Sequence, residues 1–495
     1  MGVLRVKSVE QSIRDTEAPE HRLRKDLSAL DLTVFGIGVI VGTGIFVLTG
    51  RVAKDMAGPA VALSFVAAGV VCALAALCYA EFASTVPVAG SAYTFAFATL
   101  GEFPAWIIGW DLVLEMALGA AVVAVGWSGY LGSLLASLGV PLPAAIAGED
   151  AVFNIPAALV VLLLTAVLVL GVKLSSRVNL IIVTLKVAVI LLVIVAGLFF
   201  LTPANYTPFI PPARQTPAVE GLAAPLIQVL FGMTPVAFGV LGVFGAAAIV
   251  FFAYIGFDVV ATAAEETRNP RRDLPIGIIA SLAVCTLLYV AVSLVVVGMQ
   301  PYGQLSRAAP LADAFKAVGQ IWAATLISVG ALAGLTTVVM ILMLGQTRVM
   351  FAMSRDNLLP RGLARVHPRF GTPYRITVMT GLVVALLAGL VPLSTIAELV
   401  NIGTLFAFVV VSTAVVVLRR TRPDLPRSFR TPLVPLVPAL SVLACLYLML
   451  NLPVETWLRF VAWMLIGIVV YIGYGYRHSR LARPLPGGRS RVRPS

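Results

Sequence analysis

The chain has 495 residues, of which 60% are hydrophobic and only 12% are charged, and its mean hydropathy is +1.00. Soluble globular domains carry about twice that share of charged residues, so the composition excludes them and predicts a polytopic, all-α membrane protein. The net charge is +12. Its distribution along the chain indicates orientation in a membrane rather than binding to nucleic acid.

Long apolar runs, each near the ~20 residues that cross a bilayer, follow one another along the chain. We count twelve, at residues 30–52, 60–83, 104–136, 154–172, 178–200, 243–266, 274–299, 320–347, 376–393, 395–418, 434–453 and 456–476. The expected organisation is a cytoplasmic N-terminal segment (1–29), spans one to five (30–200), an extracellular loop (201–242), spans six to ten (243–418), a cytoplasmic loop with the last two spans (419–476), and a basic cytoplasmic tail (477–495).

The positions of Lys and Arg predict that both termini are cytoplasmic. Cytoplasmic loops of membrane proteins are rich in these residues, and on this topology most of the 35 Lys and Arg residues lie in cytoplasmic segments. The basic face is therefore expected to contact anionic lipid head groups. The remaining basic residues are Lys186, within a span, and, in outside loops, Arg51, Lys54, Arg214, Arg307, Lys316 and Arg459.

The first span contains "FGIGVIVGTGIF" (35–46), which carries four glycines. Glycine is a poor helix former, and open backbone survives in hydrocarbon only where it is buried in protein or lines a cavity. We predict that the helix stops near Val41 and restarts near Ile45. Free amides, the positive end of a helix dipole and the Thr43 hydroxyl would then suit a carboxylate. The alternative is that the glycines only let neighbouring helices approach closely.

The sixth span, "GAAAIVFFAYIGFDVVATAAEET" (245–267), carries a second candidate break at Gly256 and Asp258. Its first half would end around Phe252 to Ile255 with free carbonyls and the negative end of a dipole, which suit an ammonium. Five spans separate the starts of the two interrupted spans, so the chain predicts a five-plus-five inverted repeat. Donors from one break and acceptors from the other match the zwitterionic head of an α-amino acid.

Four stretches resemble the amino acid/polyamine/organocation transporter superfamily, and its cationic amino acid transporter branch in particular. They are "GVIVGTGIFVLTG", "FFAYIGFDVVATAAEETRNPRRDLPIGI", "GQTRVMFAMSRDNLLP" and "WLRFVAWMLIGIVVYIGYGYRHS". The resemblance covers essentially the whole chain. It implies a LeuT-type inverted-repeat fold and secondary active transport of amino acids across the plasma membrane. Animal members typically have fourteen spans, whereas bacterial relatives have the twelve that this chain predicts.

The resemblance also implies a substrate site in the two breaks. By position within the motifs, the contacts to the substrate carboxylate are expected at Ile40, Thr43 and Gly44, with Gly42 beside them, and those to its amino group at Phe252, Ala253 and Ile255. Phe252 is also expected to close the site as a gate.

Lys186, in "VNLIIVTLKVAVILLV", lies inside a span, where a central Lys costs about 2.5–3.5 kcal/mol. It lies about 13 Å along a helix from Arg177, too far for its stem to snorkel to the surface. The resemblance implies a position beside the first break, where sodium-coupled relatives hold a cation. A buried amine can release and rebind a proton. We therefore predict proton-coupled, sodium-independent transport with no metal or cofactor, although hydroxyls at Thr336 and Thr337 would suit sodium.

Further carboxylates lie in the predicted spans. Glu115 and Asp111, in "GWDLVLEMALG", are four residues apart and share a helical face. Glu115 would favour a cationic side chain, pair with Lys186, or serve only as a structural carboxylate. Asp258 either lies in the substrate site, as the resemblance implies, or accepts the free amides of the unwound segment.

The predicted function is a permease for cationic or small neutral L-amino acids that works by alternating access. A polyamine or organocation exchanger is the first alternative, although a polyamine has no carboxylate for the first break. An amino acid-sensing receptor would usually carry a long cytoplasmic extension, and an enzyme would need a catalytic constellation that the sequence lacks. The three histidines form no metal-ligand pattern. The expected partners are the amino acid and lipid, and an accessory subunit is left open.

Overall fold

The computed structural model describes residues 26–86, 91–143, 145–148, 151–171, 176–216 and 219–479. Within these ranges the chain is almost entirely helical, and its β pairings are isolated bridges such as that between Leu27 and Thr267. The segment up to residue 25 and the tail from residue 480 lie outside the described residues, so the predictions for the chain ends are not tested there.

Each apolar run of the sequence forms one helix or a pair of helices, which confirms a polytopic all-α membrane protein. Eight helical stretches are long and apolar enough to cross a membrane, and four shorter apolar helices accompany them. The helices of the runs are α2 (Ala29–Ile40) with α3 (Thr49–Val52), α4 (Val61–Thr85), α6 (Glu102–Ser137), α7 (Ile155–Val169), α8 (Ser176–Gly197), α10 (Gly239–Val250) with α11 (Phe257–Val260), α12 (Pro270–Met299), α14 (Ile321–Arg355), α15 (Tyr374–Leu390), α16 (Leu393–Thr421), α17 (Leu436–Leu450) and α18 (Val454–Val470).

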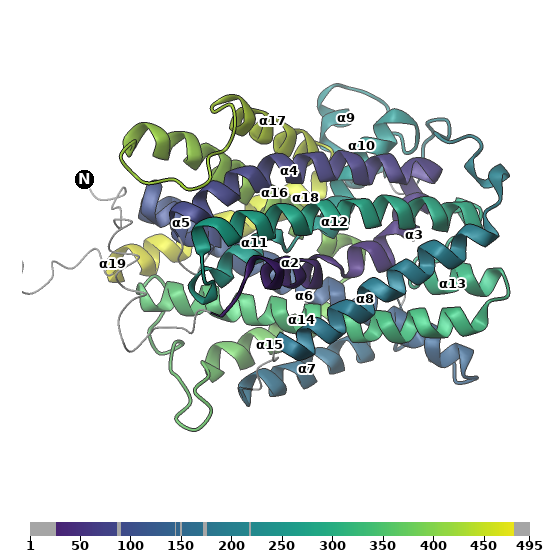
Figure 1. Ribbon diagram of the computed structural model, residues 1–495, viewed down its shortest axis with the longest axis horizontal. Helices are drawn as coiled ribbons and strands as arrows, with labels where there is room; N and C mark the ends of the chain where they lie inside the picture. The colour runs from purple at the N-terminus through teal and green to yellow at the C-terminus, as the bar shows by residue number, and fades with distance from the viewer. Residues whose placement is uncertain are drawn as a thin grey trace, which may run out of the picture.

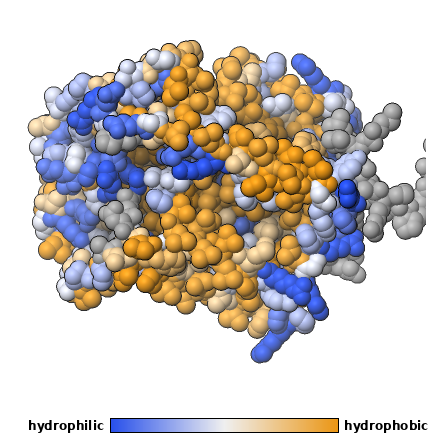
Figure 2. Space-filling model, turned by 180° about the vertical axis from the view of Figure 1, so that it is seen from behind, coloured by the Kyte–Doolittle hydropathy of each residue, from blue (hydrophilic) through white to orange (hydrophobic). Residues whose placement is uncertain are grey.

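The long helices lie side by side along the longest dimension of the molecule (Figure 1). Short helices connect them, namely α5 (Ser91–Thr99), α9 (Leu226–Leu230) and α13 (Pro310–Ala317), and the short α19 (Tyr476–His478) follows α18. Apolar residues cover the middle of the face in Figure 2, and hydrophilic residues gather towards its two ends. Large apolar side chains are exposed at the surface, and Leu163, Leu287 and Val469 are among them. Such a surface suits lipid rather than water.

The start of α12 corrects one local expectation from the sequence. Asp273 and Pro275 resemble an N-cap and a first-turn proline, but the helix begins at Pro270 with Asn269 as its N-cap residue. Pro275 therefore lies inside the helix. The dipeptide Asn269-Pro270 offers the same pair of start signals earlier in the chain, and the helix uses that earlier pair.

Candidate functional site

The first break, which we define as residues 41–43, lies where the glycines predict it. α2 ends at Ile40, and Val41 has an extended backbone with φ −72° and ψ 93°. The helix resumes as a wide π-helical turn over Gly44–Leu48, before α3. The backbone around the break therefore leaves carbonyls and amides outside the regular helical ladder.

The second break, defined as residues 251–256, interrupts the sixth span. After α10 the chain forms a 3₁₀ turn over Phe251–Tyr254, and Ile255 is extended. Gly256 has φ +122°, which only glycine adopts without strain, and α11 follows it. Asp258 Oδ1 accepts the Gly256 N–H at 3.2 Å. This bond supports the alternative in which Asp258 holds the unwound segment together.

The two breaks lie against each other. A Cβ placed on Gly44 would come within 2.2 Å of the Ala253 Cα, and one on Gly256 would meet a Val39 methyl at 2.7 Å. The hydroxyl of Tyr289, on α12, lies 2.7 Å from the Ile40 carbonyl oxygen and 2.9 Å from that of Ala253. One side chain thus contacts open carbonyls of both broken helices.

Lys186 lies at the first break and is fully buried, so it does not snorkel. Its ammonium donates to the Gly38 carbonyl at 2.7 Å and to the Val41 carbonyl at 3.2 Å. Gly334 of α14 makes room for the lysine stem, because a Cβ there would lie 2.8 Å from Cε. Among the described residues no carboxylate forms an ion pair with Lys186, so the expected pairing with Glu115 is absent in this conformation.

The hydroxyls that were considered for sodium donate to their own helix. Thr336 Oγ1 donates to the Leu332 carbonyl at 2.7 Å, and Thr337 Oγ1 donates to the Gly334 carbonyl at 2.8 Å. Thr336 also accepts the indole N–H of Trp127 at 3.0 Å. Both hydroxyl protons are therefore committed to bonds inside α14.

A small cavity lies between the two breaks, α6 and α14. Its volume is about 20 Å³, which holds about one water molecule. The lining is Val39, Ile40, Gly42, Thr43, Gly44, Glu115, Gly119, Val123, Phe252, Ile255, Val338 and Leu342. It includes most of the predicted substrate residues. Ala253 and Asp258 are not among the lining residues, because the Ala253 carbonyl faces Tyr289 and Asp258 faces the backbone of the second break.

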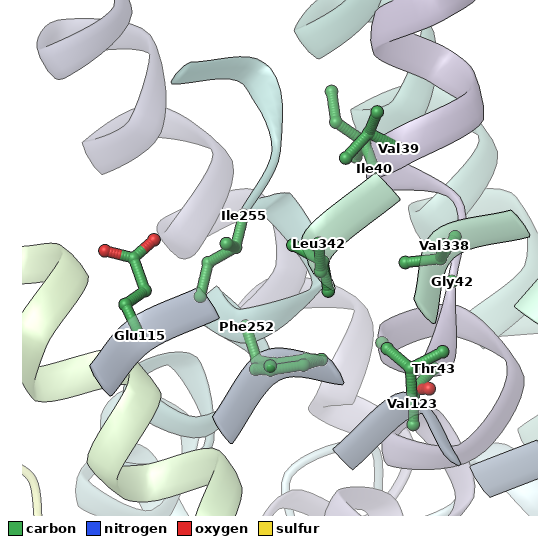
Figure 3. Close-up of a pocket in the computed structure, with 12 residues that line it drawn as sticks. Val39, Ile40, Gly42, Thr43, Glu115, Val123, Phe252, Ile255, Val338 and Leu342 are labelled. Carbon is green, nitrogen blue, oxygen red and sulfur yellow. The ribbon is translucent and has the colours of Figure 1, made fainter. Parts of the chain in front are cut away.

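Two polar side chains lie on opposite sides of this cavity, with the Phe252 ring between them (Figure 3). Thr43 is fully buried, and its hydroxyl has no partner among the described residues. Glu115 of α6 is 3% exposed, and its Oε2 is likewise without a partner there. Buried polar groups normally find a partner. The cavity is therefore lined at opposite sides by two residues, Thr43 and Glu115, that each carry a polar atom without a partner among the described residues.

The comparison with known families agrees with this geometry. The family model described as amino acid permease matches residues 27–474, which is nearly the whole chain. The chain belongs to the amino acid permease family.

Relatives of the permease are transporters and not enzymes. It is 50% identical to the branched-chain amino acid permease BcaP of Bacillus subtilis, over 97% of this chain and 99% of that protein. It is also 50% identical to the methylthioribose transporter of the same organism, over 93% and 95% of the two chains. Identity to the human cationic amino acid transporter 4 is 32%, over 98% of this chain and 91% of the relative. The suspected family is thereby confirmed.

Several residues of the permease site escaped the sequence analysis. Tyr289 is a single tyrosine in an apolar span, and nothing in the sequence marks its contacts. Asn401 of α16 donates to the Ala248 and Ile249 carbonyls at 2.8 and 3.0 Å, at the end of α10. A lone Asn within a membrane span was the available signal, because such residues need a partner in hydrocarbon. Gly334 carries no signal apart from being small.

Proposed function

We propose that this permease carries amino acids across the plasma membrane by proton-coupled, sodium-independent alternating access, with both termini in the cytoplasm. The observation that carries the proposal is Lys186, whose ammonium occupies the open carbonyls of the first break. A cation there neutralises the free oxygens of the break, as a metal ion would. When the amine loses its proton, the carbonyls lose the positive charge that neutralises them, and the proton and the shape of the first break become linked.

We place the head group of the substrate between the breaks, where the cavity of about 20 Å³ must widen to admit it. Thr43, whose hydroxyl has no partner among the described residues, lines the cavity at the start of the restarted helix, where the dipole favours a carboxylate. Phe252 and Ile255 bring the backbone of the second break to the same cavity. Its open carbonyls suit an ammonium. Main-chain groups thus bind the part that all α-amino acids share.

Neutral substrates are the first candidates for the side chain. Val123, Val338 and Leu342 line the cavity beside Phe252, and such a wall favours an apolar side chain. The similarity to a branched-chain amino acid permease supports the same class. Cationic substrates are the second candidate, because Glu115 offers a carboxyl oxygen that lacks a partner among the described residues. The test is whether unlabelled leucine, alanine or arginine competes best with labelled leucine for uptake, which ranks neutral against cationic substrates.

Alternating access requires interactions that open and close at each end of the site. Towards α13, the Tyr130 hydroxyl of α6 donates to the Phe46 carbonyl at 2.7 Å, which joins α6 to the restarted first helix. At the other end, Glu81 of α4 binds Arg419 of α16 at 2.7 Å. Rocking of α2, α4, α10 and α12 against the remaining helices would break one set while keeping the other.

Uptake into proteoliposomes tests the coupling. We expect the wild-type permease to accumulate amino acid when the outside is acidic, and to ignore a sodium gradient. Lys186→Met should abolish this accumulation. Lys54→Met is the matched control, since Lys54 also donates to a carbonyl, that of Leu305 at 3.0 Å, but far from the breaks. Uptake that follows sodium and ignores pH would contradict the proposal.

A polyamine or organocation exchanger remains the alternative within this family. Putrescine has two ammonium groups and no carboxylate, so it leaves the Thr43 side of the cavity without a charged partner. Competition of labelled amino acid by alanine but not by putrescine supports the permease, whereas efficient competition by putrescine supports the exchanger.

A further inference from the structure

Two buried carboxyls lie one helical turn apart on α6. Glu115 lines the cavity, and its Oε2 has no partner among the described residues. Asp111 is fully buried, and both of its oxygens are without a partner in the same part of the chain. Residues four apart share one face of a helix, so Asp111 continues the line from the cavity towards the Glu102 end of α6.

Neighbouring helices confine Asp111 without binding it. A Cβ on Gly403 of α16 would lie 2.6 Å from Oδ1 and 3.6 Å from Oδ2, so the carboxyl packs directly on this glycine. From α14, Gln346 donates to the Val113 carbonyl, between the two acids in sequence, and its own Oε1 has no partner there. Among the described residues, the charged groups near Glu115 are Asp111 and Asp258, both acidic, and the Thr404 hydroxyl of α16 lies beside its carboxyl.

An ionised carboxylate in such surroundings is strongly disfavoured. Burial of a charge requires a counter-ion or several hydrogen bonds, and inside a membrane the cost is greater. Two adjacent negative charges would also repel each other. A protonated carboxyl avoids both costs.

We infer that Asp111 and Glu115 form a second proton-carrying site of the permease, placed between the substrate cavity and the cytoplasmic end of α6. Both carboxyls hold their protons in the closed conformation. When the cytoplasmic side of the permease opens and water reaches Asp111, its O–H bond breaks, and the proton passes to water and leaves a hydrated carboxylate. This role in transport rests on the proposed proton coupling, whereas the protonation of the pair does not.

Infrared spectroscopy of the purified permease in lipid tests the pair directly, because a protonated carboxylic acid has its own C=O band. We expect this band at neutral pH to shrink in Asp111→Asn and again in Glu115→Gln. Glu102→Gln is the matched control. Glu102 is also buried on α6, but its two oxygens accept hydrogen bonds from Tyr471 and Ser479 at 3.1 and 2.7 Å, and we expect this variant to leave the band unchanged. An unchanged band in Asp111→Asn would overturn the inference.

Transport adds the functional test. Asp111→Asn should lower pH-driven accumulation several-fold while substrate still raises the unfolding temperature, since Asp111 does not line the cavity. If Asp111→Asn accumulates as much substrate as the wild type does, the transport role of the pair is wrong. If the wild type itself ignores the pH gradient, the coupling proposal fails, and the infrared band decides the pair separately. If Asp111→Asn does not fold, Gly403→Ala, whose methyl presses on Oδ1, should shift the same band.

Discussion

Gly44 and Ala253 lie in direct backbone contact, because a Cβ on Gly44 would come within 2.2 Å of the Ala253 Cα and 3.0 Å of its nitrogen. This contact brings the restarted half of the first broken helix onto the second break. It also shows that the glycines of the first span can both interrupt the helix and let neighbouring helices approach closely. Gly36 and Gly38 allow close approach of Ser281 and Val183, whereas Gly42 and Gly44 lie at the break itself.

Replacing Gly44 by Ala should disrupt the site. The added methyl meets backbone atoms, which cannot move aside, so we expect a loss of about 1–3 kcal/mol of stability together with loss of transport. Gly42→Ala is the control, since a Cβ there meets a Val338 methyl at 3.5 Å, an ordinary contact. Thermal unfolding and uptake compare the two variants. Equal tolerance of both would contradict the packing of the breaks.

Tyr289→Phe should weaken substrate binding. The change removes the hydroxyl that lies between the Ile40 and Ala253 carbonyls, and a buried polar group without a partner costs about 1–3 kcal/mol. Tyr206→Phe removes a comparable hydroxyl, which donates to the Leu294 carbonyl at 2.8 Å, away from both breaks. We expect both variants to lose stability but only Tyr289→Phe to lose thermal stabilisation by substrate. The same binding loss in both would count against a role for Tyr289.

Gly334→Ala should impair coupling without removing any ionisable group. Its methyl would lie 2.8 Å from Lys186 Cε and 2.9 Å from Cγ, so the lysine stem must shift and the ammonium must leave its carbonyls. We expect pH-driven accumulation to fall several-fold. Gly345→Ala is the control on the same helix, because its methyl meets the flexible Met116 thioether at 3.0 Å. Normal accumulation in Gly334→Ala would show that the position of the amine is unimportant.

The ion pairs at the two ends of the molecule should differ in strength. Glu81 is almost fully buried and binds Arg419 through both carboxylate oxygens, with the Thr431 N–H at 2.8 Å. Removing one partner of a buried pair costs about 3–5 kcal/mol. Asp55→Asn, which breaks the half-exposed pair with Arg307, should cost about 0–1 kcal/mol. Unfolding of Glu81→Gln at a temperature no lower than that of Asp55→Asn would contradict this difference.

The sequence predicts the helices and the breaks well, because hydropathy and glycine act locally. Apolar runs must become helices in lipid, and Gly42, Gly44 and Gly256 mark positions where a helix cannot continue cheaply. The twelve runs and both breaks therefore follow from the chain alone. Lys186 is also identifiable, since a lone charge in a span needs a buried partner.

Contacts between distant spans are harder to predict. The bonds from Lys186 to Gly38 and Val41 depend on how α8 packs against α2, and the bridge by Tyr289 depends on α12. The residues alone contain no signal for these packings, and only the family resemblance places Lys186 beside the first break. The sequence allowed three roles for Glu115. The structure argues against only one of them, an ion pair with Lys186, because in this conformation the lysine bonds to carbonyls instead.

The central claim is that the two breaks bind opposite ends of one zwitterion. The most direct measurement compares thermal stabilisation of the wild-type permease by leucine, by its decarboxylated amine and by its deaminated acid at equal concentrations. A ligand raises the unfolding temperature only when it binds the folded state. We predict stabilisation by leucine alone. Equal stabilisation by the amine or the acid would contradict the claim, because a single charged end would then suffice.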